Sequence, residues 1–182
     1  DGDRRLTYRE WANCIGALQK SFYKRGLTRG DRILTILQNR YEAATIHWAC
    51  QMSGIAVVPL NWRSKPEEID YCAQNSDVKL AFVEEISLQN YLDSETSKSI
   101  PVVLCTDTAS SSTHVYFDSL MEEVGEPTPD GHVEDISVML FTSGTTGKPK
   151  GVPRKQRAER AAGVAHVAQN QYAMGEVTLG VM

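Results

Sequence analysis

The chain has 182 residues, a hydrophobic content of 41% and a formal net charge of −4 at pH 7. This length is sufficient for one domain with a sizeable core. The charge balance gives no sign of a nucleic-acid-binding surface, and no apolar run approaches the roughly 20 residues that a membrane-spanning helix needs.

The first half of the chain alternates helices with short apolar strands. Thr7, with Glu10 three residues later, has the pattern of a capping box, which predicts a helix from there to about Lys24. Gly26 fits the end of that helix. Residues 32–37 form a near-continuous apolar run, typical of a parallel strand covered on both faces. The expected strands here are 32–37, 55–60, 79–83 and 101–105, and the further helices are 40–52, 66–75 and 85–91.

The second half is expected to begin with a surface loop over residues 106–114. Residues 126–133 contain two prolines and a glycine and are predicted to connect two sub-regions, 1–125 and 134–182. A strand is predicted over 136–141, and a helix over about 154–172. A face of small residues on this helix suggests close packing on a sheet. It consists of Ala158, Ala161, Ala162, Ala165, Ala168 and Tyr172.

This alternation of strands and helices predicts an α/β fold with a mainly parallel sheet. Cys14, Cys50, Cys72 and Cys105 lie far apart and form no C-x-x-C pair. Buried structural thiols in a reducing cytoplasm are therefore expected, rather than a zinc or redox site. His47 is expected to be a packed or half-buried side chain on a helix, not a base.

The most informative stretch is 141–151, which reads F-T-S-G-T-T-G-K-P-K-G. Glycines bring backbone N–H groups close to an anion, hydroxyls donate to phosphate oxygens, and lysines supply positive charge. Only two residues separate Gly144 from Gly147, and Pro149 follows the first lysine, so the loop is not a Walker A motif. The predicted phosphate-binding residues are Thr142, Ser143, Gly144, Thr145, Thr146, Gly147, Lys148, Lys150 and Gly151.

This loop resembles the signature loop of the adenylate-forming enzymes, among them the AMP-forming acyl-CoA synthetases, luciferases and peptide-synthetase adenylation domains. Three further segments resemble that family in the same order along the chain: 6–10 (L-T-Y-R-E), 26–33 (G-L-T-R-G-D-R-I) and 53–68. Their order carries more weight than any one segment. The resemblance implies the layered α/β fold of the family's large N-terminal domain, of which residues 1–182 would be a truncated portion.

The resemblance also implies a reaction. A carboxylic acid attacks Mg-ATP, an acyl-adenylate and pyrophosphate form, and coenzyme A then takes the acyl group. ATP, Mg²⁺ and coenzyme A are thus the expected cofactors and cosubstrates. The family's catalytic lysine and its small C-terminal domain would lie beyond Met182, so no catalytic residue and no protein metal site is expected within the chain. The chain alone is expected to be inactive, with residues 142–150 poorly ordered when no anion is bound.

Several alternatives stay open. The loop could belong to a nucleotide-binding module without catalysis, to an amino-acid adenylation domain, or to a scaffold whose loop stays empty. Lys155 and Gln156 stand where the family often has Ser or Thr followed by His, which leaves the subgroup open. Fatty, aromatic and amino acids all remain open as substrates. Acyl-CoA synthetases are modestly favoured over amino-acid adenylation domains, and a cytoplasmic location is expected.

Overall fold

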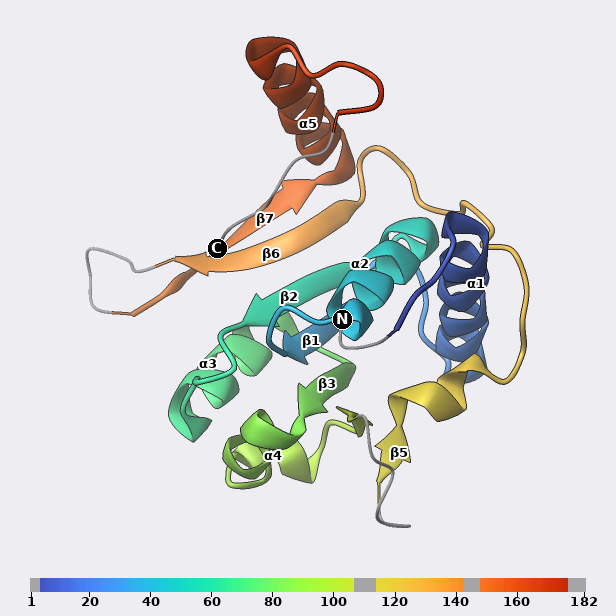
Figure 1. Ribbon diagram of the computed structural model, residues 1–182. Helices are drawn as coiled ribbons and strands as arrows, with labels where there is room; N and C mark the ends of the chain where they lie inside the picture. The colour runs from blue at the N-terminus through green and yellow to red at the C-terminus, as the bar shows by residue number, and fades with distance from the viewer. Residues whose placement is uncertain (1–3, 107–113, 143–147, 177–182) are drawn as a thin grey trace.

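The computed structural model describes residues 4–106, 114–142 and 148–176, which form one seven-stranded sheet flanked by helices (Figure 1). The strands are β1 (Arg32–Ile36), β2 (Ala56–Leu60), β3 (Leu80–Glu84), β4 (Val102–Cys105), β5 (Val115–Tyr116), β6 (Ile136–Thr142) and β7 (Lys150–Lys155). The helices are α1 (Tyr8–Lys24), α2 (Tyr41–Ser53), α3 (Pro66–Ser76), α4 (Glu85–Leu92) and α5 (Gln156–Asn170), with the short 3-10 helices η1 (Glu95–Lys98) and η2 (Phe117–Met121).

The strand order is β5-β4-β3-β1-β2-β6-β7. Of the pairings between described strands, that of β6 with β7 is antiparallel and all others are parallel. The predicted α/β fold with a mainly parallel sheet is therefore confirmed.

Side chains of the central strands alternate between two buried cores. On one face of the sheet, Ile33 and Phe82 pack with apolar side chains of α1, α2 and η2. On the other face, Leu34 and Val83 pack with those of α3 and α4. Successive residues of a strand point to opposite faces. Both faces of these strands are covered, which explains the near-continuous apolar runs in the sequence.

The capping box predicted at the start of the first helix is present. The backbone N–H of Glu10 donates to the Thr7 hydroxyl at 3.2 Å, and the Thr7 N–H donates to the Glu10 carboxylate at 2.7 Å. The Thr7 hydroxyl also donates to this carboxylate, at 2.8 Å, and the two hydrogen bonds from Thr7 to the carboxylate, the backbone one first, lower the pKa of Glu10. The chain leaves the helix at Gly26, whose φ of +76° is the left-handed conformation that glycine tolerates.

The segment predicted as a connector lies against α1 and α2 (Figure 1). The side chain of Gln19 donates to the carbonyl of Thr128 at 2.6 Å and accepts from its N–H at 2.8 Å. The N–H groups of Asp130 and Gly131 both donate to the carbonyl of Met52, at 2.8 and 2.9 Å. The connector is thus anchored on two helices, and its role as a boundary between 1–125 and 134–182 stays a prediction.

The last part of the chain differs from the prediction in two ways. Residues 150–155 form strand β7, which the sequence reasoning missed, so the final helix begins at Gln156 and not at Arg154. Pro153 is acceptable in β7 because an edge strand does not need every N–H for pairing. The predicted packing of the alanine face on a sheet is wrong, since no residue of α5 is buried. The helix follows an edge strand and leaves the sheet (Figure 1).

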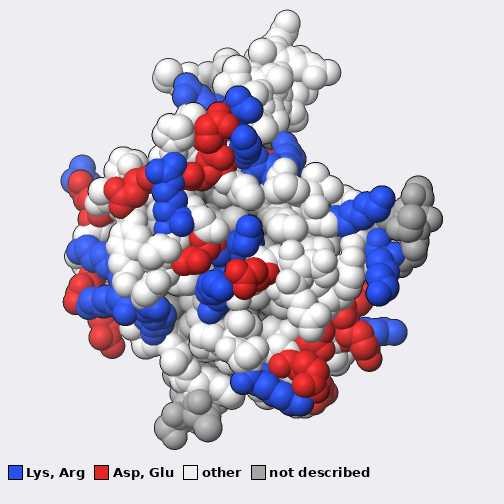
Figure 2. All heavy atoms as spheres, turned by 180° about the vertical axis from the view of Figure 1, so that it is seen from behind, with Lys and Arg blue, Asp and Glu red and all other residues white. Residues whose placement is uncertain are grey.

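Three of the four thiols are buried, as expected, and Cys14 is partly buried. All four are free, and burial raises the pKa of Cys72 to about 11. Among the helices of the described residues, none combines the length and apolar character that crossing a membrane requires. Acidic and basic side chains are interspersed over the described residues of the face seen in Figure 2.

Candidate functional site

The predicted phosphate loop joins the two strands of the β6–β7 hairpin. Thr142, the last residue of β6, pairs with Lys150, the first residue of β7. The loop follows the carboxyl end of β6. Because β6 runs parallel to β2, this end lies at the edge of the sheet where the parallel strands also end, and ligands of open α/β sheets bind at that edge. Ser143, Gly144, Thr145, Thr146 and Gly147 lie outside the described residues, as does most of the segment expected to be poorly ordered.

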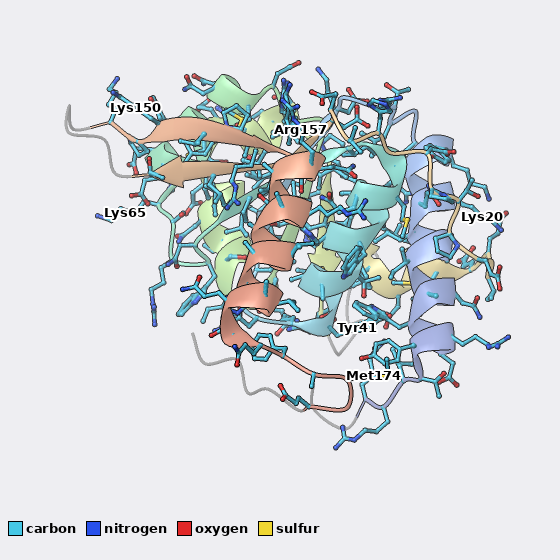
Figure 3. All side chains as sticks on the ribbon, turned by 90° about the horizontal axis from the view of Figure 1, so that it is seen from above. Lys20, Tyr41, Lys65, Lys150, Arg157 and Met174 are labelled. Carbon is cyan, nitrogen blue, oxygen red and sulfur yellow. The ribbon has the colours of Figure 1, made fainter. Side chains whose placement is uncertain are left out.

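Both lysines of the loop lie at the surface. Figure 3 shows Lys150 at the outer end of the hairpin, far from Arg157 at the start of α5. Thr142, Lys148 and Lys150 are all exposed. Within the described residues, no carboxylate forms an ion pair with either lysine. Their positive charge is thus available to an anion from solution.

Gly151, the second residue of β7, lies opposite Phe141 at the base of the hairpin, and its predicted phosphate contact stays a prediction. Gly151 is not among the glycines with positive φ, so conformational freedom does not explain it. A Cβ atom at this position would lie 2.3 Å from Cε of Met139 and 3.2 Å from Cζ of Phe141. Phe141 is the cross-strand partner of Gly151. The glycine therefore leaves room for side chains of β6 to lie over the base of the hairpin.

Tyr71, on α3, contacts the base of the loop and was not identified from the sequence. Its hydroxyl donates to the carbonyl of Pro149 at 2.9 Å. Its ring lies edge-on to Phe141, with centroids 6.3 Å apart, and 5.7 Å from Nζ of Lys148. The hydrogen bond spans 78 positions in the chain, and no local pattern in the sequence signals such a contact.

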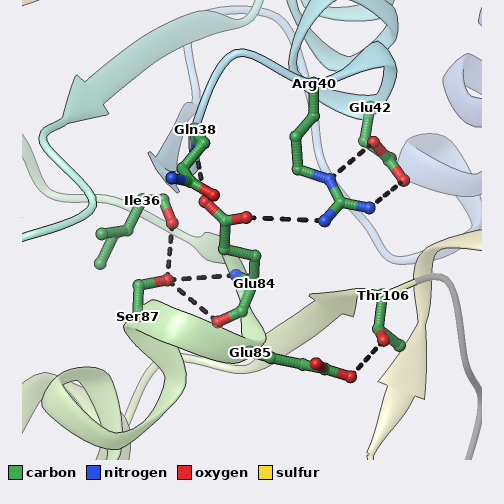
Figure 4. Close-up of polar contacts among 8 residues, drawn as sticks. All are labelled: Ile36, Gln38, Arg40, Glu42, Glu84, Glu85, Ser87 and Thr106. Carbon is green, nitrogen blue, oxygen red and sulfur yellow. Dashed lines mark hydrogen bonds and ion pairs between the residues drawn. The ribbon is translucent and has the colours of Figure 1, made fainter. Parts of the chain in front are cut away.

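A second polar cluster fills the point where the strand order reverses. The chain passes from β1 to β2 on one side of β1 and then to β3 on its other side. In doubly wound sheets, the crevice at the carboxyl ends of such strands is a common ligand site. Here the protein's own side chains occupy it (Figure 4).

The centre of this cluster is an ion network. The Arg40 guanidinium contacts both carboxylate oxygens of Glu42 at 3.1 Å and one oxygen of Glu84 at 3.5 Å. Glu42 and Glu84 are 4% and 3% exposed, so their charges depend on these partners. Glu84 also accepts from the N–H of Gln38. The Ser87 hydroxyl donates to the carbonyl of Ile36 at 2.7 Å and accepts from the N–H of Glu84 at 3.1 Å. This arrangement ties β1, α2 and α4 together and leaves the hairpin as the candidate site.

His47 behaves as the sequence predicts. It is half-buried on α2, and its ring lies edge-on to Trp48 with centroids 5.9 Å apart. Burial lowers its pKa, an effect that the nearby charge of Glu159 opposes. Within the ranges that the structure describes, His, Cys, Asp and Glu side chains form no group of three suited to a metal ion.

Known proteins share this sequence pattern and fold. The chain is 28% identical to 4-hydroxybutyrate–CoA ligase 2 of Metallosphaera sedula over 97% of its own length and 34% of that protein's. The structure of ATP-bound MatB from Rhodopseudomonas palustris has a TM-score of 0.74 at 21% identity, covering 91% of this chain and 32% of that one. The o-succinylbenzoate CoA synthetase (MenE) of Bacillus subtilis, in complex with the acyl-adenylate intermediate OSB-AMP, has a TM-score of 0.76 at 21% identity, covering 95% and 33%.

The chain thus spans about a third of the length of these proteins. The two structures establish that the fold is shared. Membership of a family is shown separately, because residues 1–182 match the family described as AMP-binding enzyme. The chain belongs to the AMP-binding enzyme family.

Proposed function

We propose that this chain forms the N-terminal part of an AMP-forming carboxylate–CoA ligase, and that the loop between β6 and β7 binds the β and γ phosphates of ATP. Family membership supports the nucleotide, and relatives whose names describe CoA ligases support the reaction class. The observation that carries the proposal is the hairpin, which sets Thr142 opposite Lys150 at the base of a loop rich in glycine and hydroxyl residues.

The chemistry needs positive charge at this place. When a carboxylate attacks the α-phosphorus of ATP, the bond to the β-phosphate breaks and negative charge grows on the departing pyrophosphate. Fixed N–H groups, hydroxyls and ammonium groups near that charge stabilise the transition state. Lys150 is exposed and forms no ion pair with a described carboxylate, so it would meet the pyrophosphate without first breaking a contact.

The remaining participants follow from the same proposal. ATP and coenzyme A are cosubstrates, and a small carboxylic acid is the substrate. Mg²⁺ arrives with ATP and neutralises its phosphates, since Mg²⁺ is usually held by substrate phosphates rather than by an all-protein cage. The catalytic lysine would come from a small C-terminal domain of the same chain. The four free thiols fit a reducing, cytoplasmic location.

The test is carboxylate-dependent pyrophosphate release by the complete protein. It is assayed with Mg-ATP and a panel of fatty, aromatic and amino acids, with and without coenzyme A. We expect release with at least one acid, followed by AMP formation that depends on coenzyme A. The isolated chain of 182 residues should stay at background, and Lys150→Ala should be much slower than the wild type.

Other outcomes favour the alternatives. Binding of ATP without pyrophosphate release would indicate a nucleotide-binding module. Activation of amino acids with no transfer to coenzyme A would indicate an amino-acid adenylation domain. Absence of both ATP binding and pyrophosphate release would contradict the proposal.

A further inference from the structure

The phosphate loop has two stems, the end of β6 (Phe141 and Thr142) and residues 148–150, which lead into β7. We propose that Tyr71 is a positioning residue for adenylation, holding the second of these stems so that Lys150 meets the departing pyrophosphate. This inference rests on the proposed function and concerns how the same site is kept in place. Tyr71 comes from α3, which lies outside the hairpin, and it precedes Pro149 by 78 positions in the chain.

The first step of the argument is the hydrogen bond. The pairing of Thr142 with Lys150 is the last one of the β6–β7 ladder. The carbonyl of Pro149 is thus the first backbone acceptor beyond the paired strands, and the Tyr71 hydroxyl donates to it at 2.9 Å. Proline has a fixed φ, so holding its carbonyl also restricts the direction in which the chain leaves the ladder.

The second step is that one ring contacts both stems. Phe141, on the first stem, lies edge-on to the Tyr71 ring at 6.3 Å and 74°. Lys148, on the second stem, places Nζ 5.7 Å from the ring centroid, within the range of a cation–π interaction. Tyr71 therefore joins the two stems through α3, and it places Lys148 against a ring while Lys150 faces solvent.

The third step is that the fold does not need the Tyr71 side chain. The buried residues of α3 are Ile69, Cys72, Ala73 and Ser76, and these anchor the helix on the sheet. Tyr71 itself is only half-buried. A change that removes only its hydroxyl should leave α3 in place and release the carbonyl of Pro149.

The experiment uses three variants of the complete protein. Tyr71→Phe removes the hydrogen bond and keeps the ring, and Tyr71→Leu removes both. Tyr23→Phe is the matched control, because the Tyr23 hydroxyl also makes a long-range hydrogen bond, to Asp130 at 2.7 Å, away from the loop. Each variant is assayed separately for two reactions. Adenylation is measured as pyrophosphate release, and thiol transfer is measured with a supplied acyl-adenylate.

We expect Tyr71→Phe to lower kcat/KM for ATP in adenylation by about 2- to 10-fold, the value of one net hydrogen bond. Tyr71→Leu should lower it further. Thiol transfer should stay close to the wild type in both variants, and Tyr23→Phe should change neither reaction. Equal losses in both reactions, or Tyr71 variants that match Tyr23→Phe, would overturn the proposal.

A binding measurement separates this proposal from the proposed function. The dissociation constant of inorganic pyrophosphate is measured for the wild type and the same three variants. If the wild type binds pyrophosphate but releases none from ATP, and Tyr71→Phe weakens the binding, then the proposed reaction is wrong and the role of Tyr71 in holding the phosphate loop stands. If the wild type binds no pyrophosphate, both proposals are wrong.

Discussion

The central parallel strands and the β6–β7 hairpin with α5 are built in different ways. In β3, every residue is buried, and the Phe82 ring packs edge-on against the rings of Phe22 and Phe117, with centroid distances of 6.3 and 6.2 Å. In β7, each residue is exposed or half-buried, and α5 has no buried residue. Burial of apolar surface, the main stabilising contribution in folding, is therefore concentrated in the region without the candidate site.

The two regions also differ in how they treat charge. The core encloses Glu42 and Glu84 and places Arg40 between them. At the loop end of the hairpin, Lys148 and Lys150 are exposed and form no ion pair with any described carboxylate. The core thus compensates its charges internally, whereas the loop end of the hairpin presents positive charge outward and depends on Tyr71 of α3 for its position.

The largest effect on stability is expected in the core. Phe82→Ala should reduce the free energy of unfolding by about 3–5 kcal/mol, as is usual when a buried aromatic side chain is removed. Val164→Ala, on α5, should change it by less than about 0.5 kcal/mol because Val164 is 61% exposed. Urea unfolding of the chain measures both. Similar losses in the two variants would mean that the two regions do not differ as described.

Smaller changes in stability are expected at two glycines, one in the hairpin and one in α5. Gly151→Ala should destabilise the hairpin by about 1 kcal/mol, because a Cβ would press on Met139 and Phe141. Gly163→Ala should stabilise α5 by about 0.5–1 kcal/mol, because nothing lies within 4 Å of a Cβ there and alanine favours a helix. Hydrogen exchange of the β7 and α5 amides reports each change locally. Effects of the same sign would contradict this account.

The smallest effect is a pH dependence through His47. Burial lowers its pKa in the folded state, so the unfolded chain takes up this proton first as the pH falls. The stabilising contribution is present above the ordinary pKa of 6.5 and is lost as the pH falls through that value towards the lower pKa of the folded state. The urea midpoint, followed from about pH 8 to 5, should fall less in His47→Gln than in the wild type. An unchanged slope would show that His47 is not the group responsible.

The parts of the fold that could be predicted from sequence are those with local signals. Thr7 and Glu10 mark the start of α1, and the run of β1 is mostly apolar. Strand β7 was missed because glycine and proline weaken its pattern, and it forms through pairing with β6.

The candidate site was predicted as a loop but not as a supported structure. The composition of residues 141–151 indicates phosphate chemistry by itself. Tyr71 lies 78 positions from Pro149, and Arg40, at the start of α2, also pairs with Glu84 on β3. Such contacts depend on the strand order, which no local pattern encodes.

The most direct test of the central claim compares two lysines in the two half-reactions of the complete protein. Lys150→Ala should slow adenylation by roughly ten- to a thousandfold, since a contact to the charge that develops on pyrophosphate is lost. Thiol transfer from a supplied acyl-adenylate should change much less, because pyrophosphate has already left. Lys148→Ala should cost less than Lys150→Ala, since Lys148 lies against the Tyr71 ring. Equal losses in both half-reactions, or a larger loss from Lys148→Ala, would contradict the role given to Lys150.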